Sequence, residues 1–288
     1  MKIGKTYIGL DLGGTKLFAA RVDKSEILAT DHRYLPVDNG DENVVIQLII
    51  DSISSLMDET VSAIGIGLPS TVDSQRGIVY DVQNIPSWKE VHLADRLREY
   101  FHMPVYMNND ANCYALGEAY YGQGQGSDFF VGMTLGTGLG AGIVYKNQLL
   151  EDANGGSGEF GILPYLDATL EDYCSGGFFK RKLAADGKTV AQKAEQGDKE
   201  AIEAYQEYGR HLGVALKIVM STLDPKRIVL GGSIAQSRAL FEKYMRESLN
   251  DFPFQKAKEN IEISFSNTNN MAVLGAASLC FQYEKIEA

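Results

Sequence analysis

Cysteine, basic charge and long apolar segments are all scarce in this sequence. Its 288 residues include three cysteines, which are far apart and odd in number, and this suits reduced thiols better than a disulfide framework. The 27 lysines and arginines are outnumbered by 38 aspartates and glutamates, so the net charge is −11. Because nonspecific binding to nucleic acid requires a basic surface, we expect no nucleic-acid partner.

No segment is typical of a membrane span or a secretion signal. The longest uncharged stretch, residues 129–145, is shorter than a bilayer span and contains five glycines. The first residues run directly into a strand-like segment that ends at Asp11, without the apolar core and cleavage site of a signal peptide. We therefore expect a cytoplasmic protein with no membrane partner.

Short β-branched runs alternate with segments of helical periodicity, which indicates an α/β fold. The predicted strands are residues 6–11, 16–22, 26–34, 61–67, 104–107, 226–230 and 261–265, with two more flanking Gly136. The main predicted helices are residues 42–58, 93–101, 110–121, 199–223 and 271–283.

One segment of the sequence is repeated in the second half of the chain. Residues 7–15 align with residues 130–138, with aromatic, β-branched, glycine, apolar, polar, leucine and glycine residues in the same order. Both copies continue as a predicted strand after the glycines. The repeat implies a duplicated domain, with two similar hairpins facing one cleft.

The first hairpin turn, Asp11-Leu-Gly-Gly-Thr-Lys16, has the outline of a phosphate site. Glycines let backbone N–H groups approach an anion without a Cβ in the way, and Thr15 adds a hydroxyl donor. Asp11 can hold a hydrated Mg²⁺. The alternative is an ordinary hairpin, because Gly-Gly turns are common.

The second turn, residues 135–142, matches a dinucleotide-binding fingerprint in its spacing of glycines but not in its context. That fingerprint opens a helix, whereas the residues from Ile143 continue as a strand. This context disfavours a nicotinamide enzyme, and a phosphate would meet a hairpin here.

Further candidate residues lie at the ends of predicted strands and in one loop. Asn109 and Asp110 stand at a strand-to-helix junction, where Asp110 is either catalytic or a helix cap. Gly231 and Gly232 directly follow a predicted buried strand. Because they have no side chains, they would let an adenosine lie against the backbone. Glu159 and Glu171 can accept hydrogen bonds from sugar hydroxyls, or they are solvated surface acids.

Together these motifs resemble those of the ROK family, which is named for repressors, open reading frames and kinases. The family's motifs are Asp-x-Gly-Gly-Thr-Lys, Asn-Asp, Leu-Gly-Thr-Gly-x-Gly-x-Gly, Gly-Glu-x-Gly, Leu-Glu followed by Ser-Gly, and a late Gly-Gly. All six occur here in that order, between residues 11 and 232. The resemblance implies duplicated actin-like ATPase domains of the ribonuclease H-like kind, around a central nucleotide cleft. We expect these domains to be residues 1–112 and 113–270, with a C-terminal helix at 271–288 completing the first.

The resemblance also implies a role for each matching residue. Asp110 matches the family's catalytic base, and Asn109, Glu159 and Glu171 match its sugar ligands. The positions that match its nucleotide-binding residues are Asp11, Gly13, Gly14, Thr15 and Lys16 in the first turn, Gly136, Thr137 and Gly138 in the second, and Gly231 and Gly232 beside the adenosine.

The sequence departs from the family at its zinc loop. Family members commonly have a histidine after Gly-Glu-x-Gly and then a cysteine-rich loop, and these residues bind a structural zinc. In this sequence Ile162 stands at the position of that histidine, and only residues 163–170 separate Ile162 from Glu171. We therefore expect no zinc site. The departure also removes a histidine that contacts the sugar, which leaves the identity of the sugar open.

The resemblance implies ATP-dependent phosphorylation of a hexose or N-acetylhexosamine at the 6-hydroxyl, with ATP and Mg²⁺ as cofactors and Asp110 as the general base. A homodimer is suggested by the resemblance alone. One alternative is a sugar-responsive transcriptional regulator, but only ten residues precede Asp11, too few for a helix-turn-helix. The other alternative is a noncatalytic sugar sensor.

Overall fold

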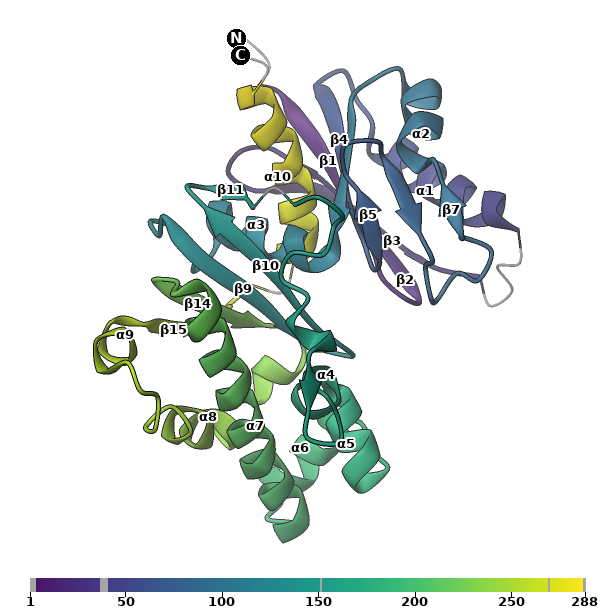
Figure 1. Ribbon diagram of the computed structural model, residues 1–288. Helices are drawn as coiled ribbons and strands as arrows, with labels where there is room; N and C mark the ends of the chain where they lie inside the picture. Colours follow the sequence, from purple (N-terminus) through teal and green to yellow (C-terminus); the bar gives the residue numbers. More distant parts are fainter. Residues whose placement is uncertain (1–3, 37–40, 151, 269, 287–288) are drawn as a thin grey trace. The chain divides into compact units, whose positions relative to one another are not determined.

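The computed structural model describes residues 4–36, 41–150, 152–268 and 270–286, which divide into two α/β units (Figure 1). The first unit comprises Met1–Gln125, Asn147–Ser157 and Asn270–Ala288, and the second comprises Gly126–Lys146 and Gly158–Asn269. The predicted α/β class is confirmed.

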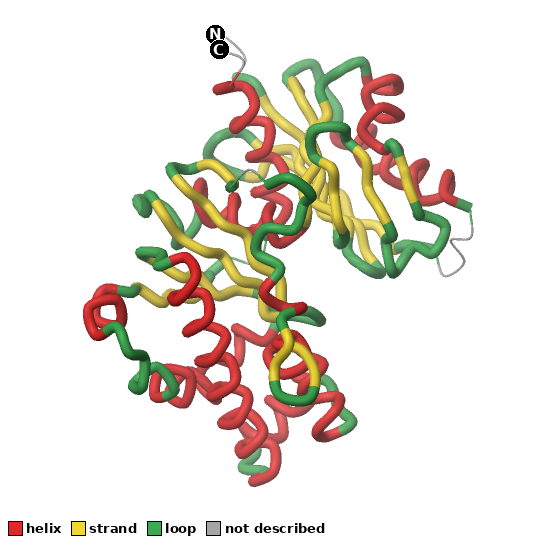
Figure 2. The backbone as a smooth tube through the Cα atoms, viewed as in Figure 1, coloured by secondary structure: helices red, strands yellow, loops and turns green. Residues whose placement is uncertain are grey.

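The first unit is built on a five-stranded sheet in the order β3-β2-β1-β4-β8. Figure 2 draws the strands of both units in yellow. Its strands are β1 (Thr6–Leu12), β2 (Lys16–Val22), β3 (Ile27–Tyr34), β4 (Val61–Leu68) and β8 (Val105–Asn109). The first three strands form an antiparallel meander, and β4 and β8 run parallel to β1. The carboxyl ends of β1, β4 and β8 therefore meet at one edge of the sheet.

Helices cover both faces of this sheet. Alternation along β1 sends Ile8, Leu10 and Leu12 into one core, with residues of α1 (Glu42–Leu56) and α2 (Leu93–Phe101). Tyr7 faces the other way and packs with residues of α3 (Asp110–Tyr121) and α10 (Met271–Ile286). Every second residue of β1, Asp11 included, consequently faces α3 and α10.

Two glycines allow α10 to lie directly on the sheet. A Cβ at Gly9 would be 2.1 Å from the Val273 carbonyl oxygen, and one at Gly65 would be 1.8 Å from that of Ala276. Helix α10 thus belongs to the first unit, and its expected last residues, 287 and 288, lie outside the described residues.

Helix α3 packs against α10 just as closely. A Cβ at Gly275 would be 1.6 Å from the Cys113 carbonyl oxygen. This packing keeps α3 with the first unit, so the first boundary lies at Gln125 instead of the expected residue 112.

Short elements that the periodicity did not indicate complete the first unit. They are the antiparallel sheet of β5 (Thr71–Asp73), β6 (Ile78–Tyr80) and β7 (Glu90–Val91), and the two-residue β11 (Gln148–Leu149). The Leu149 N–H donates a hydrogen bond of 3.1 Å to Gln282 Oε1 of α10, which attaches β11 to this unit.

The second unit repeats the strand arrangement of the first. Its sheet contains β9 (Phe129–Leu135), β10 (Leu139–Tyr145), β14 (Arg227–Gly231) and β15 (Glu262–Phe265). β10 is antiparallel to β9, and β14 and β15 run parallel to β9, in the order β10-β9-β14-β15. This is the order and direction of β2-β1-β4-β8, which confirms the predicted duplication.

Helices pack against the sheet of the second unit around the 25-residue α7 (Lys199–Leu223). The rings of Tyr205 and Tyr208 of α7 pack against those of Phe179 and Phe241, and all four side chains are buried. The other elements are η1 (Phe160–Ile162), β12 (Pro164–Tyr165), β13 (Ala168–Thr169), α4 (Leu170–Cys174), α5 (Gly176–Leu183), α6 (Gly187–Glu195), η2 (Ile234–Ser237), α8 (Arg238–Glu247) and α9 (Gln255–Asn260).

A helix able to cross a lipid bilayer is not found among the residues that the structure describes.

Candidate functional site

In the first unit, three residues form a row across the carboxyl ends of the parallel strands. Asp11 pairs with Gly67, and Gly67 pairs with Asn108 in the next strand. All three face α3, and the middle position carries no side chain. A Cβ at Gly67 would lie 3.3 Å from Cys113 Sγ and 3.6 Å from Asp110 Cα. The glycine therefore leaves room for the start of α3 between two polar residues.

Asp110 is the first residue of α3, and its neighbour Asn109 is the N-cap. Asn109 Oδ1 accepts hydrogen bonds from the N–H groups of Ala111 at 2.9 Å and Asn112 at 3.4 Å. Asn109 Nδ2 donates one of its two protons to the Ser70 carbonyl oxygen at 3.3 Å. Of the two roles considered for Asp110, the cap thus belongs mainly to Asn109, although Asp110 Oδ1 also accepts from the Ala111 N–H at 2.8 Å.

Asp11 and Asp110 interact electrostatically. Burial, and then the negative charge of Asp110, raise the pKa of Asp11 from its ordinary value of 3.8 to about 7. Mg²⁺ is usually held by one or two carboxylates together with substrate phosphates. Asp11 and Asp110 are two carboxylates, the number that this pattern needs. Among the described residues, no group of three or more His, Cys, Asp or Glu able to hold a metal occurs.

The turn of the first hairpin is closed by its own backbone. The Gly13 N–H donates to the Lys16 carbonyl oxygen at 2.8 Å, and the Thr15 carbonyl accepts from the Leu35 N–H at 3.0 Å. The Lys16 ammonium lies over the Tyr34 ring. A Cβ at Gly14 would lie 2.7 Å from Nδ2 of Asn84, a neighbour of this turn that the sequence analysis missed.

In the second unit, the turn at Gly136, Thr137 and Gly138 is held by α4 and α5. The Gly136 carbonyl accepts from the Gly176 N–H of α5 at 2.8 Å. Glu171 Oε2 of α4 accepts from the Leu139 N–H at 2.9 Å, and it would lie 2.6 Å from a Cβ at Gly138. Glu171, a predicted sugar ligand, thus contacts the predicted phosphate turn.

The other predicted residues of the second unit lie beside this turn. Partial burial and the charge of Glu171 raise the pKa of Glu159, so these two carboxylates are close. Gly232 has a φ of +87° and would bring a Cβ to 2.5 Å from the Leu135 carbonyl oxygen, where β9 ends. The structure thus gathers Glu159, Glu171, both late glycines and the second turn in one region of the unit.

Residues 163–170, the short segment expected to replace the family's zinc loop, are held by aromatic contacts. Tyr165 Oη lies 3.0 Å from His211 Nδ1, and the Tyr173 ring packs on both side chains. The Arg181 guanidinium lies 4.3 Å from the Tyr173 ring centroid. Ile162 remains 70% exposed beside Gly161.

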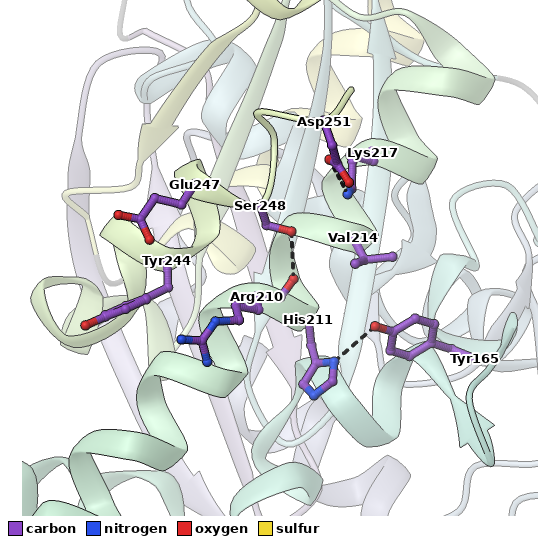
Figure 3. Close-up of a pocket in the computed structure, with 9 residues that line it drawn as sticks. All are labelled: Tyr165, Arg210, His211, Val214, Lys217, Tyr244, Glu247, Ser248 and Asp251. Carbon is purple, nitrogen blue, oxygen red and sulfur yellow. Dashed lines mark hydrogen bonds and ion pairs between the residues drawn. The ribbon is translucent and has the colours of Figure 1, made fainter. Parts of the chain in front are cut away.

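A cavity of about 450 Å³ is lined by Tyr165 of this segment and by residues of α7 and α8 (Figure 3). Its polar groups pair with one another: Lys217 Nζ lies 2.7 Å from Asp251 Oδ1, and Ser248 Oγ donates to the Arg210 carbonyl at 3.1 Å. None of the predicted site residues line it.

Three comparisons relate the chain to known proteins. A sequence model of the ROK family matches residues 7–283. The glucokinase of Thermotoga maritima is 31% identical, over 94% of this chain and 96% of the relative. The xylose repressor of Bacillus subtilis is 24% identical, over 96% of this chain and 77% of the relative.

One solved structure adds ligands to the comparison. It is a ROK family glucokinase from Streptomyces griseus in complex with glucose and AMPPNP, which is 28% identical and has a TM-score of 0.82. The match covers 96% of this chain and 99% of that one.

Proposed function

The chain belongs to the ROK family, and we propose that it is an ATP-dependent kinase of a hexose or N-acetylhexosamine that phosphorylates the 6-hydroxyl. The likeness to a glucokinase at 31% identity and to a solved glucokinase with glucose and AMPPNP supports a sugar and a nucleotide as ligands. The observation that carries the proposal is the placement of Asp110 at a strand-to-helix junction, electrostatically coupled to Asp11.

Asp110 is the proposed general base. Phosphoryl transfer passes through a loose transition state, so the protein mainly positions the reacting groups. The sugar oxygen bonds to the γ-phosphorus as the bond to the ADP oxygen breaks, and the hydroxyl proton passes to Asp110. The start of α3 favours the negative charge of the carboxylate before transfer.

The remaining predicted residues divide between the two substrates. Asn109, Glu159 and Glu171 would bind sugar hydroxyls, and an amide with a spare N–H and two carboxylates have the groups to do so. Gly13, Gly14, Thr15 and Lys16, with Gly136, Thr137 and Gly138, would bind phosphates, and Gly231 and Gly232 would adjoin the adenosine. Asp11 would hold Mg²⁺ through water, and the ion would neutralise phosphate charge.

Measuring ADP release tests this function directly. The panel is glucose, N-acetylglucosamine, N-acetylmannosamine, fructose and allose, each with ATP and Mg²⁺. We expect turnover with at least one sugar, and the position of the phosphate on the product identifies the hydroxyl. If no sugar of the panel stimulates ADP release but sugar binding is retained, the result would favour a sensor or a regulator like the xylose repressor.

Replacing the proposed base gives the largest single effect that we expect. The change Asp110→Asn should lower kcat by roughly 10²- to 10⁴-fold, with sugar affinity largely kept, because the amide cannot accept the proton. Steady-state kinetics and sugar titration measure the two effects. The control is Asp95→Asn, which changes an acid in the first turn of α2 and should leave kcat unaltered. Unchanged turnover in Asp110→Asn would remove Asp110 from this role.

A further inference from the structure

Asp110 lies between two asparagines whose side chains are bonded to each other. Asn108, the residue of β8 that directly precedes the cap, accepts a hydrogen bond at its Oδ1 from Asn112 Nδ2 at 2.8 Å. The same oxygen accepts from the Asn109 backbone N–H at 2.8 Å. One acceptor thus joins the residue before Asp110 to the residue two positions after it.

This contact is not needed to cap the helix. Asn109 Oδ1 already accepts from the N–H groups of Ala111 and Asn112, and Asp110 Oδ1 shares the Ala111 N–H. The cap therefore satisfies the first donors of α3 without any contribution from Asn108. The bond between the two asparagines instead fixes the backbone on both sides of Asp110.

Asn108 and Asn112 also occupy positions where an apolar side chain could be buried at a lower cost in free energy than an amide. Asn112 is only 7% exposed, and burying an amide is unfavourable unless it is hydrogen-bonded. Asn108 lies in the row with Gly67, which admits the start of α3 to the sheet. A directional bond at this point specifies how that first turn sits on the ends of the strands.

We propose that Asn108 and Asn112 are positioning residues that hold the Asp110 carboxylate in its working orientation. The proposal rests on the function given above, in which Asp110 receives the proton of the sugar hydroxyl. Neither asparagine belongs to the residues that we assign to the nucleotide or the sugar. Loss of the bond should thus lower kcat and leave substrate binding unchanged.

The test compares Asn108→Leu, Asn112→Leu and the double variant with the unsubstituted protein. Leucine has the same number and branching of side-chain heavy atoms as asparagine but neither donates nor accepts. A misplacement of about 1 Å can cost about 10²-fold in rate, so we expect each single variant to lower kcat about 10- to 100-fold. The KM for the sugar and the KM for ATP should change less than about threefold.

The double variant separates a shared bond from two independent effects. If both substitutions break one contact, the loss of kcat in the double variant should be close to that of Asn108→Leu, and not the product of the two single losses. Should either leucine variant fail to fold, Asn112→Asp keeps the shape of the side chain and replaces the donor with an oxygen. It should show the same loss of kcat.

A matched control removes the contribution of general destabilisation. Asp198 caps α7, and its Oδ1 accepts from the Ala201 N–H at 2.9 Å. Asp198→Ala should lower the thermal midpoint by an amount similar to the asparagine variants without changing kcat. A kcat loss specific to the asparagine variants at equal midpoint supports positioning.

The outcomes that overturn the two proposals differ. No turnover by the unsubstituted protein across the sugar panel would overturn the proposed function and this inference with it. Turnover by the unsubstituted protein and loss in Asp110→Asn, but with unchanged kcat in both leucine variants, would overturn this inference alone.

Discussion

The hairpin β1–β2 of the first unit and the hairpin β9–β10 of the second occupy the same place in their sheets but carry different chemistry. In the repeat, Asp11 corresponds to Thr134. Asp11 is a carboxylate coupled to Asp110, whereas the Thr134 hydroxyl lies 3.5 Å from the Gly140 carbonyl oxygen of its own hairpin. The first hairpin therefore offers a carboxylate that can hold a cation beside a phosphate, whereas the second hairpin has no carboxylate at the matching position.

The two turns also differ in what holds them. The first turn is closed by the bond from the Gly13 N–H to the Lys16 carbonyl. The second is bonded to Glu171 of α4 and Gly176 of α5. A movement of Glu171, the proposed sugar ligand, would therefore be transmitted to the proposed phosphate turn through this hydrogen bond.

Replacing the polar side chain at each of the two equivalent positions, Asp11 and Thr134, tests the chemical difference between the hairpins. Asp11→Asn should lower kcat/KM for ATP roughly 100-fold or more, because loss of even an outer partner of a metal typically costs 10- to 100-fold. Thr134→Val keeps the shape and should cost a few-fold at most. Steady-state kinetics at varied Mg²⁺ measures both. Equal losses in the two variants would show that the hairpins do not divide the work in this way.

A methyl group in the second turn separates folding from phosphate binding. A Cβ at Gly136 would meet no atom within 4 Å, so Gly136→Ala should leave the thermal midpoint unchanged. If backbone donors of this turn approach a phosphate, the methyl should weaken nucleotide binding about tenfold, or about 1.4 kcal/mol. The control is Gly4→Ala, which is equally unobstructed. Unaltered nucleotide affinity in Gly136→Ala would place the phosphate elsewhere.

The charge of the first hairpin also predicts a dependence of stability on pH. A carboxyl whose pKa rises from 3.8 to about 7 on folding binds its proton more tightly in the folded protein. Its contribution therefore favours folding below about pH 4 and is lost as the pH rises from about 4 to about 7. The slope is roughly 1.4 kcal/mol per pH unit at most.

Urea unfolding between pH 4.5 and 7.5 measures this dependence. In Asp11→Asn the stability should fall less steeply over that range, while Thr134→Val should follow the unsubstituted protein. An identical slope in all three proteins would contradict the raised pKa of Asp11.

The sequence predicted the long elements of the fold well, because each one combines periodicity with clear boundaries. The strands flanking Gly136 and the helix at 199–223 are examples, since glycines mark the turn and Asp198 caps the helix. The sheet of β5, β6 and β7 was missed because strands of two or three residues carry no readable period. The expected boundary after residue 112 failed to include α3, whose packing on the distant α10 is a tertiary effect.

The same limit applies to the candidate site. Motifs indicated which side chains to consider, and the structure places those of each unit close to one another. Asn108 was missed because its role depends on a bond to Asn112 and on its register beside Gly67. The alternation of Tyr106 and Asn108 on one face of β8 is the signal that could have found it. The raised pKa of Asp11 could not be predicted, since it arises from burial and from a carboxylate 99 positions away along the chain.

The close seating of α10 on Gly9 and Gly65 has a consequence for synthesis of the protein. A ribosome releases β1 and β4 long before it reaches residue 271, so the strip of backbone that α10 covers stays open while the second unit is being made. The second unit is built from Gly126–Lys146 and Gly158–Asn269, which all precede α10 in the sequence. The first unit therefore lacks its covering helix until residues 271–286 have been made, after every segment of the second unit.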